Sequence, residues 1–221
     1  MDHCKKTLIA CTLLLAAACT SIPPIEQQFS GYLDDYSDMI PVRTEDGSDA
    51  LRWYLPDLGE RTYSKLWIKP IVFYPKPDTS SAQVSLERLN EISRYMTQAL
   101  KSELTNDFEL VGQAGPDTAI LQFAITGVET PTEGLKPRNV IPVSLLISGV
   151  SYAAGERDHI VVVYLEGQAT DAVSGETLAK GVRQAVGGRL SDDQEQLAIE
   201  HVQEYVKEWA ADVATLTRNI Q

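Results

Sequence analysis

The chain has 221 residues, of which 43% are hydrophobic and 23% are charged, so it can bury a sizeable core in one domain or two small ones. It carries 19 Lys and Arg against 31 Asp and Glu, for a net charge of -12. Binding to a nucleic-acid backbone depends on Lys and Arg that displace counterions, so we expect no nucleic-acid partner. The chain also lacks the basic cluster that would hold it on anionic lipid by charge alone.

The first residues are typical of a secretory signal. Lys5 and Lys6 form a positive front, and an apolar run over 7–15 leads to three alanines before Cys19. The run is too short to span a bilayer, which takes roughly 20 apolar residues. Cys19 after the alanines resembles the lipobox of bacterial lipoproteins. This resemblance implies cleavage after Ala18, diacylglycerol on Cys19 and acylation of the new amino terminus, for example with palmitate. The alternative is an ordinary cleaved signal or an uncleaved anchor.

Residues 19–28 indicate how the protein would be sorted and tethered. Thr20, and not Asp, follows Cys19, which is similar to the sorting pattern of Gram-negative lipoproteins at the outer membrane, facing the periplasm. Paired prolines and the lack of an apolar period predict a tether that spans at most about 30 Å. We therefore expect a signal peptide over 1–18, a lipidated tether over 19–28 and one periplasmic domain over 29–221. Cleavage leaves Cys19 as the single cysteine, which excludes disulfides and cysteine-based zinc or redox sites.

The first half of the domain has mixed patterns. Weak helical spacing over 29–39 is followed by a turn signal at TEDGSD (44–49). Residues 65–74 are rich in β-formers, and Pro70 within them predicts an edge strand or a bulge. Residues 108–111 are compatible with a short strand. Apolar side chains at spacings of three and four predict a helix near 83–106, at Leu89, Ile92, Met96, Leu100 and Leu104.

The second half has clearer patterns. Residues 118–128 alternate with period two, 159–171 form a second strong strand, and 177–189 are expected to return antiparallel to it after a Ser174-Gly175 turn. A capping-box pattern at 191–194 opens a long C-terminal helix. Its apolar side chains recur at three and four, at Ala198, Val202, Tyr205, Trp209, Val213, Leu216 and Ile220.

These elements predict an α+β fold, with an antiparallel-rich sheet and two long amphipathic helices packed on it. We expect five side chains in its core: Phe123, Val162, Val202, Trp209 and Val213.

Catalytic and cofactor fingerprints are absent, since the sequence contains no HExxH, G-x-S-x-G, Walker or dinucleotide motif. We expect no cofactor, no resident metal and no enzymatic activity. Glu200, His201 and Glu204 have a helical spacing that can hold a metal, but one helix does not close a site. We therefore favour a solvated acidic helix face there.

Acidic side chains offer two further candidates. A hydrolase of envelope polymers would need a close pair of carboxylates, drawn from residues such as Asp34, Asp35 and Asp171. Two clusters are similar to parts of calcium loops but lack the alternating ligands and late Glu of a known loop, so we favour solvated turns. They are Asp34, Asp35 and Asp38 in one, and Glu45, Asp46 and Asp49 in the other.

Residues 140–154 carry no charge over fifteen positions, in a chain that is nearly one-quarter charged. If this segment is helical, Val143, Leu146, Ile147 and Val150 share one stripe, and three serines share another. The structural interpretation is a buried helix or crossover in the core. The functional interpretation is a hydrophobic contact surface for a lipid or a partner protein, formed by these four apolar side chains.

Five motifs of the chain resemble the bacterial lipoprotein family known as domain of unknown function 3313. They are FSGYLDDYSDM (29–39), ALRWYLPD (50–57), YSKLWIKPIVFYP (63–75), NVIPVSLLISG (139–149) and LEGQATDAVSGETLA (165–179). The resemblance implies an envelope lipoprotein of one domain and supplies no activity and no catalytic residues. Together with the missing fingerprints, it favours a non-enzymatic binding or accessory module that contacts the membrane through Cys19 and an envelope protein through its domain. The alternatives are the polymer hydrolase and a carrier of a small hydrophobic ligand.

Overall fold

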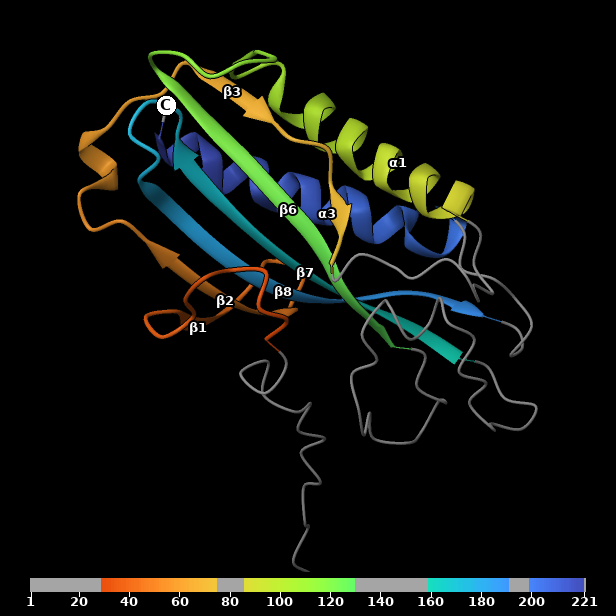
Figure 1. The fold of residues 1–221 in the computed structure, drawn as a ribbon. Helices are drawn as coiled ribbons and strands as arrows, with labels where there is room; N and C mark the ends of the chain where they lie inside the picture. The colour runs from red at the N-terminus through yellow and green to blue at the C-terminus, as the bar shows by residue number, and fades with distance from the viewer. Residues whose placement is uncertain (1–28, 75–85, 130–158, 191–198, 221) are drawn as a thin grey trace, which may run out of the picture.

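A computed structural model of the chain describes residues 29–74, 86–129, 159–190 and 199–220. Within them, one eight-stranded sheet has two helices on one face and residues 29–39 on the other (Figure 1). The strands are β1 (Ile40–Arg43), β2 (Asp49–Tyr54), β3 (Lys65–Ile68), β4 (Val72–Phe73), β5 (Glu109–Leu110), β6 (Thr118–Glu129), β7 (His159–Asp171) and β8 (Thr177–Leu190). The helices are α1 (Leu86–Leu104) and α3 (Ile199–Thr217), with short 3-10 turns η2 (Leu58–Glu60) and η4 (Arg218–Ile220).

The sheet is mixed, with strand order β1-β2-β8-β7-β6-β3-β5 and β4 paired to β6. The pairs from β1 to β6 along this order are antiparallel, whereas β6 pairs in parallel with β3 and β4, and β3 pairs in parallel with β5. The α+β class is therefore confirmed, but the expectation of an antiparallel-rich sheet is wrong. The reason is α1, which lies between β4 and β5 in the chain and so forms a crossover of the kind that joins parallel strands.

The β7–β8 hairpin confirms the predicted antiparallel return. Its turn contains Gly175 at φ +76°, a left-handed conformation that a glycine adopts without steric cost. The amide of Gly175 donates to the carbonyl oxygen of Asp171 at 2.9 Å and closes the turn.

Pro70 divides the predicted strand 65–74 into β3 and β4. Where the sheet is interrupted, the amide of Ile71 donates to Thr97 Oγ1 of α1 at 3.1 Å, and Ser93 Oγ donates to the Ile71 carbonyl oxygen. Helix α1 thus satisfies the backbone groups that the sheet leaves unpaired. Strand β3 is not an edge strand, because β5 pairs with its outer side.

The core lies between the sheet and the two helices. The five side chains predicted for the first helix are all buried, as are Val202 and Trp209 of α3, with Trp209 only 2% exposed. Phe123 and Val213 are half-buried and pack against this core. Val162 belongs to β7, but its side chain lies outside the described part of the structure.

Residues 29–39 form no helix; they cross the opposite face of the sheet as a strap, a name we use for this segment. Leu33 of the strap is buried against Leu51 of β2 and Val182 of β8. The carboxylate of Glu166, only 1% exposed, accepts hydrogen bonds from the Tyr36 hydroxyl and, at 3.2 Å, from the Ser30 amide. Burial and then the Glu166 hydrogen bond raise the pKa of Tyr36 to about 12. The strap is therefore fixed by both apolar packing and a buried carboxylate.

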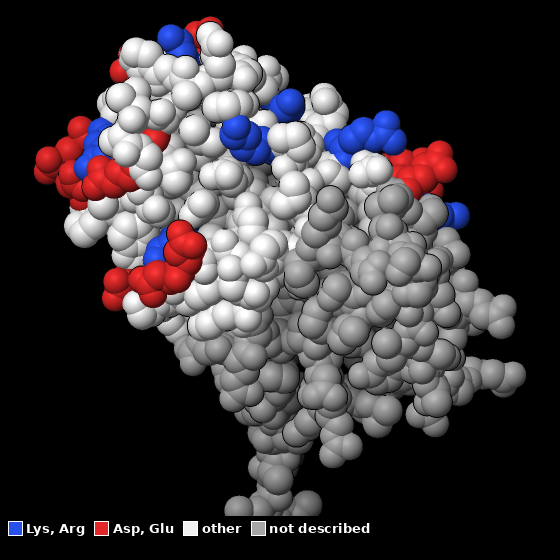
Figure 2. Space-filling view, in the orientation of Figure 1, with Lys and Arg blue, Asp and Glu red and all other residues white. Residues whose placement is uncertain are grey.

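Acidic side chains lie toward the margins of the face seen in Figure 2. Arg61 forms ion pairs with Asp57 at 3.1 Å and with Glu176 at 2.7 Å, and such solvent-exposed pairs contribute little to stability. The middle of this face is mostly uncharged, with separate blue patches of Lys and Arg (Figure 2).

Candidate functional site

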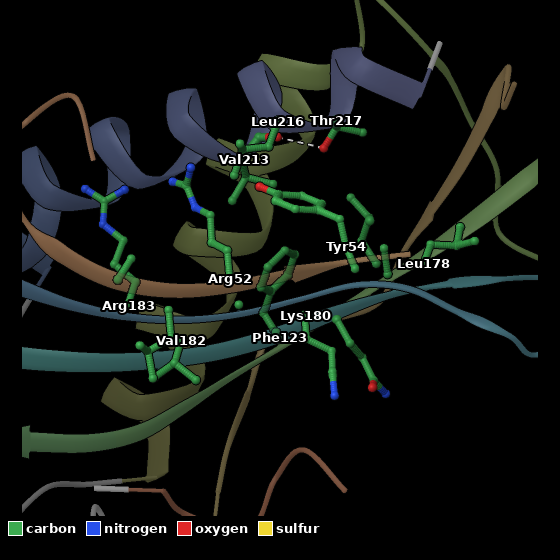
Figure 3. Close-up of a pocket in the computed structure, with 18 of the residues that line it drawn as sticks. Arg52, Tyr54, Phe123, Leu178, Lys180, Val182, Arg183, Val213, Leu216 and Thr217 are labelled. Atoms are coloured by element: carbon green, nitrogen blue, oxygen red, sulfur yellow. Dashed lines mark hydrogen bonds between the residues drawn. The ribbon is translucent and has the colours of Figure 1, made fainter. Parts of the chain in front are cut away.

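A pocket of about 120 Å³ lies between the C-terminal half of α3 and the sheet (Figure 3). Helix α3 contributes Trp209, Val213, Leu216 and Thr217 to its wall. The hydroxyl of Thr217 donates to the Val213 carbonyl oxygen at 2.7 Å, so this polar group is satisfied within the helix (Figure 3). The sheet side is lined mainly by apolar residues of four strands, among them Ala50, Tyr54, Leu121, Phe123, Ala169 and Leu178.

Two glycines that pair across β7 and β8 shape the floor of the pocket. At Gly181, an added Cβ would meet only the Leu51 carbonyl oxygen, at 3.9 Å, so the space above it is open. At Gly167, an added Cβ would lie 2.1 Å from Cδ1 of Phe123, because the Phe123 ring lies across this glycine. The ring then meets Trp209 edge to face, with 5.1 Å between ring centroids and 89° between planes.

An ion-pair network borders the pocket. Arg52 Nη2 donates to both carboxylate oxygens of Asp212, at 2.9 and 2.8 Å. Arg183 donates from Nη1 to Asp212 Oδ2 at 3.1 Å and from Nη2 to Asp46 Oδ2 at 2.7 Å. Figure 3 shows Arg52 and Arg183 extending from the sheet toward α3, whereas Lys180 and Val182 extend from the other face. The network thus joins α3 to β2, β8 and the β1–β2 turn.

The network also affects the ionisation of Asp46. Burial raises the pKa of this carboxyl, but hydrogen bonds from Thr44 and Ser48 and the charge of Arg183 outweigh burial and lower it to about 2. Close by, the Arg183 guanidinium carbon lies 5.7 Å from the centroid of the Tyr205 ring. Within the described residues, Arg183 Nε and the Tyr205 hydroxyl are buried without a hydrogen-bond partner, and burial raises the pKa of Tyr205.

Of the acids predicted for a hydrolytic site, Asp34 and Asp35 lie in the strap and Asp171 lies at the β7–β8 turn, and none of them lines the pocket. Asp171 Oδ1 accepts the amides of Val173 and Ser174, at 2.9 and 2.7 Å, and its pKa is lowered chiefly by the Ser174 amide. Asp35 accepts from the Ser37 amide, which lowers its pKa, and Asp34 is exposed. A general acid needs a raised pKa, so neither shift is of that kind.

The other sequence-predicted residues fall in two groups. Cys19, Val143, Leu146, Ile147 and Val150 lie outside the described residues. The second group lies within the described residues. It contains the acidic side chains of the two calcium-loop candidates and Glu200, His201 and Glu204 of α3. Among the described residues, no group of three or more His, Cys, Asp and Glu could hold a metal ion.

Sequence reasoning missed the pocket itself. The available signal was a glycine within each of two strong strands, Gly167 and Gly181, since a strand glycine often marks a close approach of backbone or ligand. A second signal was an arginine within each apolar strand pattern, at Arg52 and Arg183. Neither signal shows where the residues meet in space until the pairing of the strands is known.

Together, the fold and the site define a two-layer α+β protein with an apolar pocket between helix and sheet. No helix among the described residues has the length and apolar content to cross a membrane. The chain belongs to the family described as protein of unknown function (DUF3313), whose model matches residues 28–213. This confirms the resemblance expected from the sequence motifs.

Full-length relatives occur in two Escherichia coli strains. The chain is 32% identical over 214 residues to a protein named uncharacterized lipoprotein YdcL of strain K12, covering 97% of this chain and 96% of the relative. The same values apply to YdcL of strain O157:H7. The relationship supports the assignment of this chain as a lipoprotein of the cell envelope.

The solved structures that the chain matches are remote. The PelC dodecamer from Paraburkholderia phytofirmans has a TM-score of 0.35 and 9% identity, covering 78% of this chain and 96% of that chain. A minor lipoprotein from Acinetobacter baumannii has a TM-score of 0.34 and 15% identity, covering 72% of this chain and 92% of that chain.

Proposed function

We propose that this protein is attached by lipid on Cys19 to the outer membrane, on its periplasmic face, and that its domain is a non-enzymatic binding module. The signal over 1–18 and the lipoprotein relative support the anchor. Several acyl chains on one terminus supply the multiple signals that stable attachment needs.

The apolar pocket beside α3 is the observation on which the binding role rests. Its lining is mainly aliphatic and aromatic, with guanidinium groups at its border, which is the composition of a site for a small hydrophobic ligand. A dry cavity of about 150 Å³ can hold benzene, so a pocket of about 120 Å³ suits one ring or a short alkyl group. The domain thus acts as a carrier or sensor of a molecule with a small apolar part.

Calorimetric titration of the full chain with benzene tests this role. We expect saturable binding that Gly181→Val abolishes, because the new side chain enters the open space above the pocket floor. Gly112→Val is the matched control, since a Cβ at Gly112 meets nothing within 4 Å and Gly112 does not line the pocket. Equal binding by both folded variants contradicts the role.

The lipid anchor is tested separately by intact-mass analysis of the membrane fraction. We expect the wild-type chain to start at Cys19 and to carry the mass of its acyl groups. The Cys19→Ser chain should lose both the added mass and its membrane attachment. A Cys19→Ser chain that is still processed and membrane-bound contradicts the anchor.

Residues 140–154 carry the proposed contact with an envelope protein, because fifteen uncharged positions in an acidic chain are either buried or used for contact. Leu146→Asp should abolish partner capture from whole envelopes and leave the melting temperature nearly unchanged. Ser148→Asp, on the stripe of serines, is the matched control and should retain the partner. If Leu146→Asp instead unfolds the domain, the segment belongs to the core.

A further inference from the structure

A row of side chains crosses the sheet face on which the strap lies, which we call the strap face. In the strand register, Trp53 of β2 lies opposite Lys180 of β8, Lys180 opposite Gln168 of β7, and Gln168 opposite Gln122 of β6. Lys69, just after β3, extends the row, since its amide donates at 2.9 Å to the carbonyl oxygen of Leu121, the neighbour of Gln122 in β6. All five side chains are half-buried, and cross-strand neighbours in register share one face of a sheet.

Each end of this row combines a tryptophan with a lysine. The ammonium of Lys180 lies 5.1 Å from the centroid of the Trp53 ring. At the other end, the ammonium of Lys69 lies 2.9 Å from the centroid of the Trp67 ring, which belongs to β3. Such cation–π pairs keep an aromatic ring and a positive charge together at a polar surface.

The charge of the row differs from that of the chain as a whole. The row contains two lysines and two glutamines and no acid, in a chain of net charge -12. Lys180 is held by the strap, since it donates to the Asp35 carbonyl oxygen at 2.7 Å and lies 3.6 Å from its carboxylate. Asp35 of the strap therefore borders this end, and the end at Trp67 and Lys69 is the more basic one.

The strap, which directly follows the tether in the sequence, lies on this same face. Phe29, 39% exposed, begins the described strap and stacks on Tyr36 with ring centroids 4.1 Å apart. Residues 19–28 allow at most about 30 Å between the strap and a lipid on Cys19. The strap and the helices lie on opposite faces of the sheet (Figure 1), so the tether joins the domain at the face that carries the row.

We propose that the strap face rests on the lipid headgroup layer, with Trp53 and Trp67 at headgroup depth and Lys69 toward lipid phosphates. Tryptophan is enriched at membrane interfaces because its ring is apolar and its N–H is polar, and lysine extends its ammonium to the phosphate level. Contacts too weak to bind a free protein suffice here, because the anchor supplies a high effective concentration. The inference rests on the proposed anchor at Cys19.

Fluorescence quenching tests this orientation in vesicles of phosphatidylethanolamine and phosphatidylglycerol whose lipids carry bromine near the headgroup. The full lipidated chain contains three tryptophans, and Trp209 is buried on the helix side, so it reports no lipid contact. We expect the emission of Trp53 and Trp67 to fall about twofold on brominated vesicles. The matched control is the double variant W53F/W67F, whose remaining Trp209 should be unaffected by bromine.

The outcomes separate this inference from the anchor on which it rests. A lipidated chain that floats with the vesicles but is quenched no more than the double variant overturns the docked face and leaves the anchor intact. A wild-type chain that does not float overturns the anchor. A third outcome also overturns the membrane contact: the chain binds isolated peptidoglycan strands, W53F/W67F abolishes that binding, and lipid quenches neither protein. The row would then be a glycan-binding surface.

Discussion

Gly167 determines where the Phe123 ring lies, and through it the contact between the sheet and α3. We expect Gly167→Ala to destabilise the domain by about 1–3 kcal/mol, the usual range for overpacking, because its Cβ would displace the ring from Trp209. Gly181→Ala, at the paired position in β8, is the control and should change stability little, since its Cβ has open space. Urea unfolding measures both, and equal losses would show that the ring does not depend on Gly167.

Asp46 makes stability depend on pH. Its pKa falls from the ordinary aspartate value of 3.8 to about 2 in the folded chain, so folding favours the charged form. This contribution is complete above about pH 5 and is lost as pH falls through 4 toward 2. Thermal melts across this range should therefore show a smaller acid-induced drop in melting temperature for Asp46→Asn than for wild type. Parallel curves for the two proteins would mean that the hydrogen bonds from Thr44 and Ser48 and the charge of Arg183 together have no such effect.

Helix α3 is the element that closes both the core and the pocket. Trp209→Ala should lower the free energy of unfolding by about 3–5 kcal/mol, because it removes a buried ring that contacts Phe123 and lines the pocket. Glu208→Ala on the exposed side of the same helix should change stability by less than about 0.5 kcal/mol. An unchanged melting temperature for Trp209→Ala would contradict the packing of α3 on the sheet.

Elements with a strong local period could be predicted from the sequence. The strands at 118–128 and 159–171 and the first helix depend on patterns within each segment, and they were found close to their observed bounds. The C-terminal helix was also found, as α3, but its predicted capping box at 191–194 lies outside the described residues. The parallel pairing of β3 with β6 and the antiparallel pairing of β2 with β8 could not be predicted, since register is decided by distant partners. For the same reason the pocket was missed: Gly167 and Gly181 gain their role only when β7 and β8 are paired.

At the scale of the whole molecule, the strap connects the tether to the sheet through Glu166. We expect Glu166→Ala to lower the hydrogen-exchange protection of the Gly31 and Leu33 amides about tenfold, because both donate to the Tyr36 hydroxyl that Glu166 holds. Tyr36→Phe removes the hydroxyl that accepts from both amides and should have a similar effect. Amides of β7 and β8 away from the strap serve as the internal control. Protection lost evenly across the domain would instead indicate global destabilisation.

The pairing of β2 with β8 also sets the order in which the chain can fold. Leu51 packs against Val182 as well as against Leu33 of the strap, and β3 to β7 and α1 all lie between Leu51 and Val182 in the sequence. Strand β2 therefore remains an unpaired edge until nearly the whole chain is available. Bringing β2 and β8 together closes a long loop, and the chain entropy of that closure is lost before the pairing stabilises the fold. A chain interrupted before Thr177 would expose this edge to other chains, so the last strand protects the nascent protein from aggregation.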